Sequence, residues 1–114
     1  MAALEFFREG KMPDGIVCYN DQIAVQVTET LMREGIKIPG DVSVTGYDNS
    51  LYAQRGEGIT TIAHPQERLG EMAAELLLEK INHIPEEESK VERLIQPELI
   101  VRGSTKKRII KENK

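Results

Sequence analysis

The chain has 114 residues, which is enough for one small domain with a modest core. Its formal net charge of -4 argues against direct binding of nucleic acid, because contacts with phosphates need a net basic face. A single cysteine excludes an internal disulfide, no apolar run is long enough to span a bilayer, and no signal-peptide pattern is present, so we expect a cytoplasmic protein without membrane contacts.

The first elements are a helix, a strand and a second helix. Residues 2–11 predict the end of a helix, and the apolar run 16–19 predicts a buried strand. The next helix is expected to run from Asp21 to about Glu34, with Asp21 as its N-cap because a carboxylate there accepts from exposed backbone N–H groups.

This second helix carries two apolar stripes. The first stripe is the expected core face and comprises Ile23, Ala24, Val27 and Leu31. The second stripe is rotated from it and comprises Val25, Thr28 and Met32. A wide core face and burial against a neighbouring element or partner subunit are equally compatible with this pattern.

The remainder of the chain continues the alternation of strands and helices. The pattern predicts strands at 42–45 and 59–63, a helix at 66–82, and two short strands at 94–95 and 99–101. Strand, helix and strand in this order predict an α/β fold, with an open parallel sheet flanked by helices.

Polar residues follow two of the predicted strands. Asn20 and Asp21 come after the first strand, and Tyr47, Asp48 and Asn49 come after the second. Open parallel sheets bind ligands at the carboxyl ends of their strands, so this order of elements predicts a ligand crevice there.

Enzyme chemistry finds little support in the residues. No phosphate-binding glycine loop occurs, and His64 and His83 lack metal-ligand spacing to Cys18 or to each other, so we expect no catalytic residue, metal or cofactor. A small α/β enzyme with paired carboxylates remains the alternative class. The carboxylates available to it are Asp21, Asp48 and Glu57.

Three segments carry a resemblance to a known family. They are PDGIVCYNDQIA from Pro13, IPGDVSVTGYDNS from Ile38, and Ile59–Ile62 followed by Pro65 and Leu69-Gly70. In this order and at this spacing they resemble the effector-binding domain of the lactose-repressor/galactose-repressor family, over nearly the whole chain to about Thr105. Within the family, the residues of these segments are most similar to those of the arabinose repressors of Gram-positive bacteria.

The resemblance implies a two-lobed sensor domain like a periplasmic binding protein. Residues 1–63 and 97–105 would belong to its carboxyl-terminal lobe and residues 64–96 to the other lobe, with 106–114 as a disordered basic tail. DNA would be bound through an amino-terminal head domain, for which this chain holds no candidate.

The resemblance also implies a function and its residues. A small sugar effector would be bound between the lobes by Asn20, Asp48 and His64, and would control operator binding by a homodimeric, non-enzymatic repressor. The second stripe, Val25, Thr28 and Met32, would contribute to the dimer interface. A periplasmic sugar-binding protein for transport is the competing interpretation.

Overall fold

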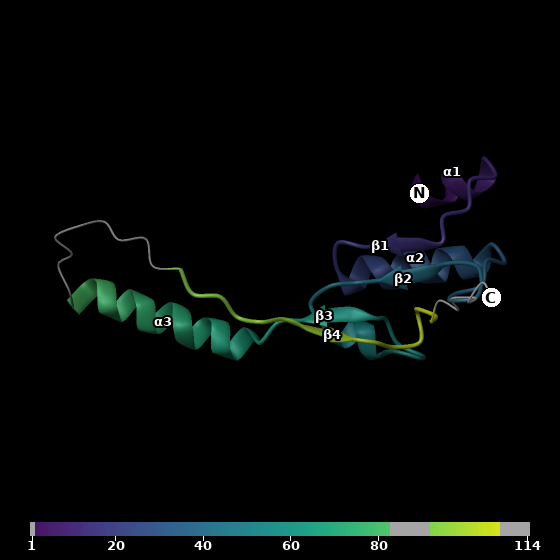
Figure 1. Ribbon diagram of the computed structural model, residues 1–114. Coiled ribbons are helices and arrows are strands. Elements are labelled where there is room, and N and C mark those ends of the chain that lie inside the picture. Colours follow the sequence, from purple (N-terminus) through teal and green to yellow (C-terminus); the bar gives the residue numbers. More distant parts are fainter. Residues whose placement is uncertain (1, 83–91, 108–114) are drawn as a thin grey trace, which may run out of the picture. The chain divides into compact units, whose positions relative to one another are not determined.

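The computed structural model describes residues 2–82 and 92–107 (Figure 1). Its elements are α1 (Ala2–Arg8), β1 (Gly15–Val17), α2 (Asp21–Arg33), β2 (Ser43–Thr45), the 3-10 helix η1 (Leu51–Gln54), β3 (Thr61–Ala63), α3 (Gln66–Asn82) and β4 (Glu98–Ile100). This succession of helices and strands confirms the predicted α/β class.

The chain forms two compact units. One comprises Met1–Ala63 with Leu99–Lys114, and the other comprises His64–Glu98. The assignment of these parts to two different lobes stays a prediction, as does a disordered tail, of which residues 108–114 lie outside the described part of the chain.

Parallel strands organise the first unit. β1 pairs with β2 in parallel, with Ile16 opposite Val44, and a parallel bridge joins Thr45 to Thr60, just before β3. β3 pairs in turn with β4. The carboxyl ends of β1, β2 and β3 therefore meet at one edge, as predicted for an open parallel arrangement.

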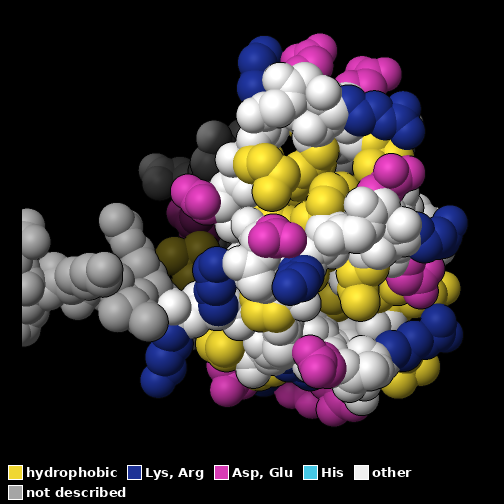
Figure 2. Space-filling model, turned by 90° about the vertical axis from the view of Figure 1, so that its right-hand side faces the viewer, with side chains coloured by type: hydrophobic (Ala, Val, Ile, Leu, Met, Phe, Trp, Pro, Cys, Tyr) yellow, Lys and Arg dark blue, Asp and Glu magenta, His cyan; other side chains and the backbone are white. Residues whose placement is uncertain are grey.

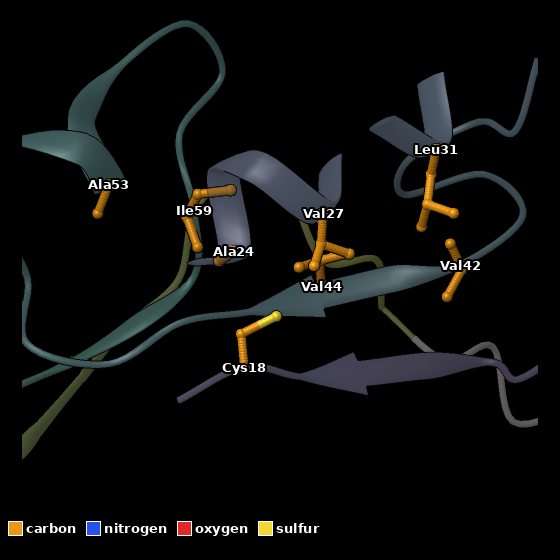
Figure 3. Close-up of a cluster of buried hydrophobic side chains, with 8 residues drawn as sticks. All are labelled: Cys18, Ala24, Val27, Leu31, Val42, Val44, Ala53 and Ile59. Atoms are coloured by element: carbon orange, nitrogen blue, oxygen red, sulfur yellow. The ribbon is translucent and has the colours of Figure 1, made fainter. Parts of the chain in front are cut away.

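The core lies between α2 and the strands (Figure 3). Ala24, Val27 and Leu31 form the buried face of α2, at the helical spacing expected of a core stripe. They pack in one cluster with Cys18, Val42, Val44, Ala53 and Ile59. Full burial of a leucine or valine side chain contributes roughly 1.5–3 kcal/mol, so this face fixes α2 to the sheet.

Two expected core positions are exposed. Ile23 was predicted to be part of the core stripe, but it is 41% exposed. It lies at the edge of the buried helix face, whereas Ala24 and Leu31 lie at the centre of that face. The run 16–19 is buried only at Cys18, whereas Val17 is 87% exposed. Side chains alternate between the faces of a strand, and the described part of the chain covers only one face of β1.

The segment before β4 also differs from the prediction. Residues 94–95 do not form a strand, and the only strand among residues 92–107 is β4. A strand needs a hydrogen-bonded neighbour, and the described residues offer none to this segment. Pro97 also lacks the amide hydrogen that would continue the pairing toward β4.

The second unit contains α3, whose bounds agree with the predicted helix at 66–82. None of its side chains is buried, although its apolar residues follow helical spacing. Within residues 2–82 and 92–107 no helix is both long and apolar enough to cross a membrane.

Candidate functional site

Asn20 begins the site at the end of β1. Its backbone is extended, with φ −151°, and its Oδ1 accepts from the Ile23 amide at 2.9 Å. Asn20 is therefore the N-cap of α2, and the prediction that Asp21 has this role was wrong. Since Oδ1 is used for capping, the Nδ2 group is the part of the side chain suited to donate to a ligand.

Asp21 instead joins the three strand ends. It is only 1% exposed, and its carboxylate accepts from the Ser50 amide at 2.7 Å and from the Thr61 hydroxyl at 2.6 Å. Its own amide donates to the Tyr47 carbonyl at 3.1 Å. These bonds connect the end of β1 to the loop after β2 and to the start of β3.

The loop after β2 has a left-handed backbone at two consecutive residues. Asp48 has φ 102° and Asn49 has φ 52°, values that non-glycine residues adopt rarely and at a cost. The Asp48 amide donates to the Ile62 carbonyl at 3.0 Å, and the Asn49 amide donates to the Thr61 hydroxyl at 3.3 Å. Contacts with β3 thus stabilise the unusual conformation of this loop.

Arg102 stabilises the same loop from the segment after β4. Its Nη2 donates to Asn49 Oδ1 at 2.8 Å, and its Nη1 donates to the Ile59 carbonyl at 3.2 Å. Its amide donates to the Thr60 hydroxyl at 2.9 Å. The sequence pattern gave no sign of this role, because Arg102 lies more than 40 residues from each of its partners.

The structure places the predicted ligand residues as follows. Asn20 and Asp48 are half-buried and lie at neighbouring strand ends, which the bond between the Asp21 amide and the Tyr47 carbonyl joins directly. His64 is half-buried and begins the second unit, so its part in a shared site stays a prediction. Amide and carboxylate groups at one edge can together donate to and accept from the hydroxyl groups of a polyol.

The described residues show no arrangement for a metal. Among them no cluster of three or more histidine, cysteine, aspartate or glutamate side chains could hold an ion. Burial raises the pKa of the Cys18 thiol, which disfavours the thiolate that a metal ligand or nucleophile would need.

A separate groove lies along the second apolar stripe of α2. It has a volume of about 330 Å³ and is lined by Val25, Thr28, Glu29, Met32, Ile38, Ile59, Ser104, Gly103 and residues 55–58. Neither Asn20 nor Asp48 belongs to this lining. The second apolar stripe of α2 therefore lines a groove that is separate from the strand ends with Asn20 and Asp48.

One face of the molecule shows how its charges are distributed. In Figure 2, basic and acidic side chains alternate around hydrophobic side chains exposed in the middle of the face. The described residues on this face form no continuous basic stripe, which is what binding to phosphates would need.

The chain resembles known proteins along most of its length. Residues 1–105 match the family described as the periplasmic binding protein-like domain. The chain is 38% identical over 111 residues to the arabinose metabolism transcriptional repressor of Geobacillus stearothermophilus. It is 41% identical over 98 residues to the HTH-type transcriptional repressor PurR of Vibrio parahaemolyticus.

These matches cover 91% and 85% of this chain, respectively, but 29% of each relative. Two solved structures resemble the fold. One is a LacI family transcriptional regulator from Arthrobacter sp. FB24 in complex with lactose (TM-score 0.76, 30% identity, covering 92% of this chain and 39% of that chain). The other is the lac repressor dimer bound to operator and an anti-inducer (TM-score 0.78, 25% identity, covering 91% and 36%).

Proposed function

The chain belongs to the periplasmic binding protein-like domain family, in the form found in repressors of the lactose-repressor/galactose-repressor family. We propose that it contributes part of the effector-binding domain of such a repressor. The chain spans about 29% of the length of the curated relatives that it matches. The head domain that binds operator DNA would lie in the rest of the full-length protein.

The proposed effector is a small sugar. The observation that carries this proposal is the pairing of Asn20 and Asp48 at adjacent strand ends, held together through Asp21. An amide donor and a carboxylate acceptor complement the alternating donors and acceptors of sugar hydroxyls. A relative named for arabinose metabolism and a related regulator in complex with lactose support this chemical class.

Arabinose is our first choice among the sugars. The similarity to the arabinose metabolism repressor of Geobacillus stearothermophilus supports it, together with the residues around Asn20 and Asp48 on which the sequence resemblance depends. His64 is proposed as a third contact from the crossing between the two units. The sugar would favour one relative arrangement of two lobes and so change how well paired head domains fit the operator.

We also propose that the groove along α2 contributes to a homodimer. The groove exposes Met32, and Val25 and Thr28 line it on the same side of α2. A second subunit could cover this apolar surface. The structural relative that was solved as a dimer supports this proposal.

A carboxylate enzyme is disfavoured by the geometry of Asp21. Both of its carboxylate oxygens accept hydrogen bonds from the protein, from Ser50 and from Thr61, so the side chain has a structural role. The two curated relatives described above are named as transcriptional repressors.

A thermal-shift screen of the full-length protein tests the proposed function. Pentoses and hexoses are added at equal concentration, and a ligand present at about 100 times its Kd stabilises the native state by about 2.7 kcal/mol. We expect L-arabinose or another aldose to raise Tm by several degrees. The absence of any shift across the whole panel at millimolar sugar would contradict the proposal.

A further inference from the structure

Asp21 has a buried carboxylate that makes no contact with the sugar in the proposed function. We propose that Asp21 is a positioning residue, which holds the loop Tyr47–Ser50 in the left-handed conformation that presents Asp48 at the strand end. This inference rests on the proposed function, since it concerns how the proposed ligand contact is held in place.

A short chain of hydrogen bonds connects Asp21 to the loop. The Asn49 amide donates to the Thr61 hydroxyl, and that hydroxyl donates to Asp21 Oδ1 at 2.6 Å. The second oxygen, Oδ2, accepts from the Ser50 amide at 2.7 Å. The carboxylate thus restrains the two residues that follow Asp48, one directly and one through Thr61, and polarisation along such a chain strengthens each bond.

The neighbouring strand leaves space for this carboxylate. A Cβ atom built on Gly46 would lie 2.3 Å from Asp21 Oδ1 and 3.0 Å from its Cα, so only glycine is compatible with the present position of Asp21. Burying a carboxylate is costly unless hydrogen bonds compensate for the lost water. The bonds from Ser50 and Thr61, together with the amino-terminal end of the α2 dipole, supply this compensation.

The backbone of the loop requires such restraint. Left-handed conformations at Asp48 and Asn49 persist only when surrounding contacts over-determine them. Asn20 already caps α2, so the Asp21 carboxylate is not needed to start the helix. The remaining role for this side chain is therefore to fix the loop.

Substitutions at Thr61 separate positioning from general stability. Thr61→Val deletes the hydroxyl while retaining a β-branched side chain of similar size, and Thr61→Ser retains the hydroxyl. Asp21→Asn provides a second variant, in which an amide nitrogen replaces one acceptor. Asp14→Asn serves as the control, because it changes an exposed carboxylate before β1 and leaves Asp21 and its partners in place.

The readout is hydrogen–deuterium exchange of the full-length protein without ligand. Peptides covering Tyr47–Leu51 are compared with peptides covering α2. We expect Thr61→Val and Asp21→Asn to speed exchange in the loop about tenfold while α2 retains its protection, because local opening is governed by local contacts. Thr61→Ser and Asp14→Asn are expected to keep wild-type protection in the loop.

Two results would overturn the assignment. The first is unchanged loop exchange in both Thr61→Val and Asp21→Asn. The second is an equal increase in the loop and in α2, which would mean that Asp21 stabilises the fold as a whole. Calorimetry with L-arabinose tests the proposed function separately. If the wild-type protein does not bind L-arabinose, arabinose is not the effector, and the exchange result still decides the role of Asp21.

Discussion

Among single residues, Asn20 has two roles, and a different atom of its side-chain amide carries each one. Oδ1 caps α2 through the Ile23 amide, and Nδ2 is the proposed donor to the sugar. An N-cap contributes about 1 kcal/mol to stability, and a hydrogen bond to a ligand contributes a similar amount to binding. A substitution that changes only one end should therefore affect only one property.

Asn20→Asp and Asn20→Ala should behave differently. Asn20→Asp retains the capping oxygen, so the free energy of unfolding should stay within about 0.5 kcal/mol of wild type, whereas Asn20→Ala should lower it by about 1 kcal/mol. Both variants lose the Nδ2 donor and should bind sugar about tenfold more weakly. Chemical denaturation and calorimetry on the full-length protein check the two effects, and tight sugar binding by Asn20→Asp would exclude the donor role.

Cys18 gives the molecule a predictable pH dependence. Burial raises the pKa of its thiol in the folded state, so the unfolded chain loses this proton at a lower pH than the folded chain does. The contribution of Cys18 to stability is thus complete below the ordinary thiol pKa and is lost as the pH rises through the raised value. The free energy of unfolding should fall above about pH 8.5, by no more than about 1.4 kcal/mol per pH unit from this group.

Cys18→Ala is the comparison for this prediction. Tyrosine and lysine side chains also titrate in this range, so the difference in slope between the two proteins isolates the thiol. Urea denaturation at pH 8 and pH 10 measures it. Parallel stability curves for wild type and Cys18→Ala would show that the thiol pKa is not raised in the folded protein.

At the scale of elements, α2 has two faces with different tasks. Its core face buries Ala24, Val27 and Leu31, while Val25, Thr28 and Met32 line the separate groove. The sequence pattern left two explanations for the second stripe, a wide core face and a partner surface. Val25 is partly buried against the core cluster, whereas Met32 is 58% exposed, so a partner surface stays our proposal for the part of the stripe that includes Met32.

Met32→Lys should weaken the proposed homodimer. A lysine would place a charge where the apolar side chain of Met32 now lies, and removing that charge from water at an interface is unfavourable even with Glu29 nearby. We expect the dimer dissociation constant of the full-length protein to rise at least tenfold by sedimentation equilibrium. Gln26→Lys adds the same charge to an exposed position of α2 outside the groove and should leave the dimer unchanged; equal effects of the two variants would argue against a specific interface.

Local sequence patterns predicted where helices and strands lie more accurately than they predicted which side chains are buried. The bounds of α2 and α3 and the parallel strand order follow from apolar spacing and turn residues, which act over a few positions. The exposure of Val17 depends on which segments cover β1, and the apolar pattern of that strand carries no such information.

The candidate site shows the same division. Asn20 and Asp48 were identified because polar residues directly follow predicted strands, which is a local signal. The role of Asp21 depends on partners 29 and 40 residues away, and that of Arg102 on partners still farther along the chain. Asp21 had a plausible local role as an N-cap, and this local explanation concealed the long-range one.

For the whole molecule, α3 shows that a large apolar surface is left uncovered by the described residues. Leu69, Leu77, Leu78 and Ile81 are exposed, although they belong to a helix with apolar spacing. Exposed apolar surface of this extent usually marks an interface. The curated relatives are more than three times as long as the segment that matches, so we expect other parts of the full-length protein to cover this helix.

We propose that a sugar effector binds at the strand ends through Asp48. Calorimetric titration of the full-length protein with the sugar that shifts Tm most tests this claim directly, comparing wild type with Asp48→Asn. Asparagine tolerates the left-handed backbone at this position, so the loop is preserved while the charged acceptor is lost. We predict at least tenfold weaker binding for Asp48→Asn and unchanged binding for Asp14→Asn at an exposed turn. Equal affinity in all three proteins would show that Asp48 does not contact the sugar.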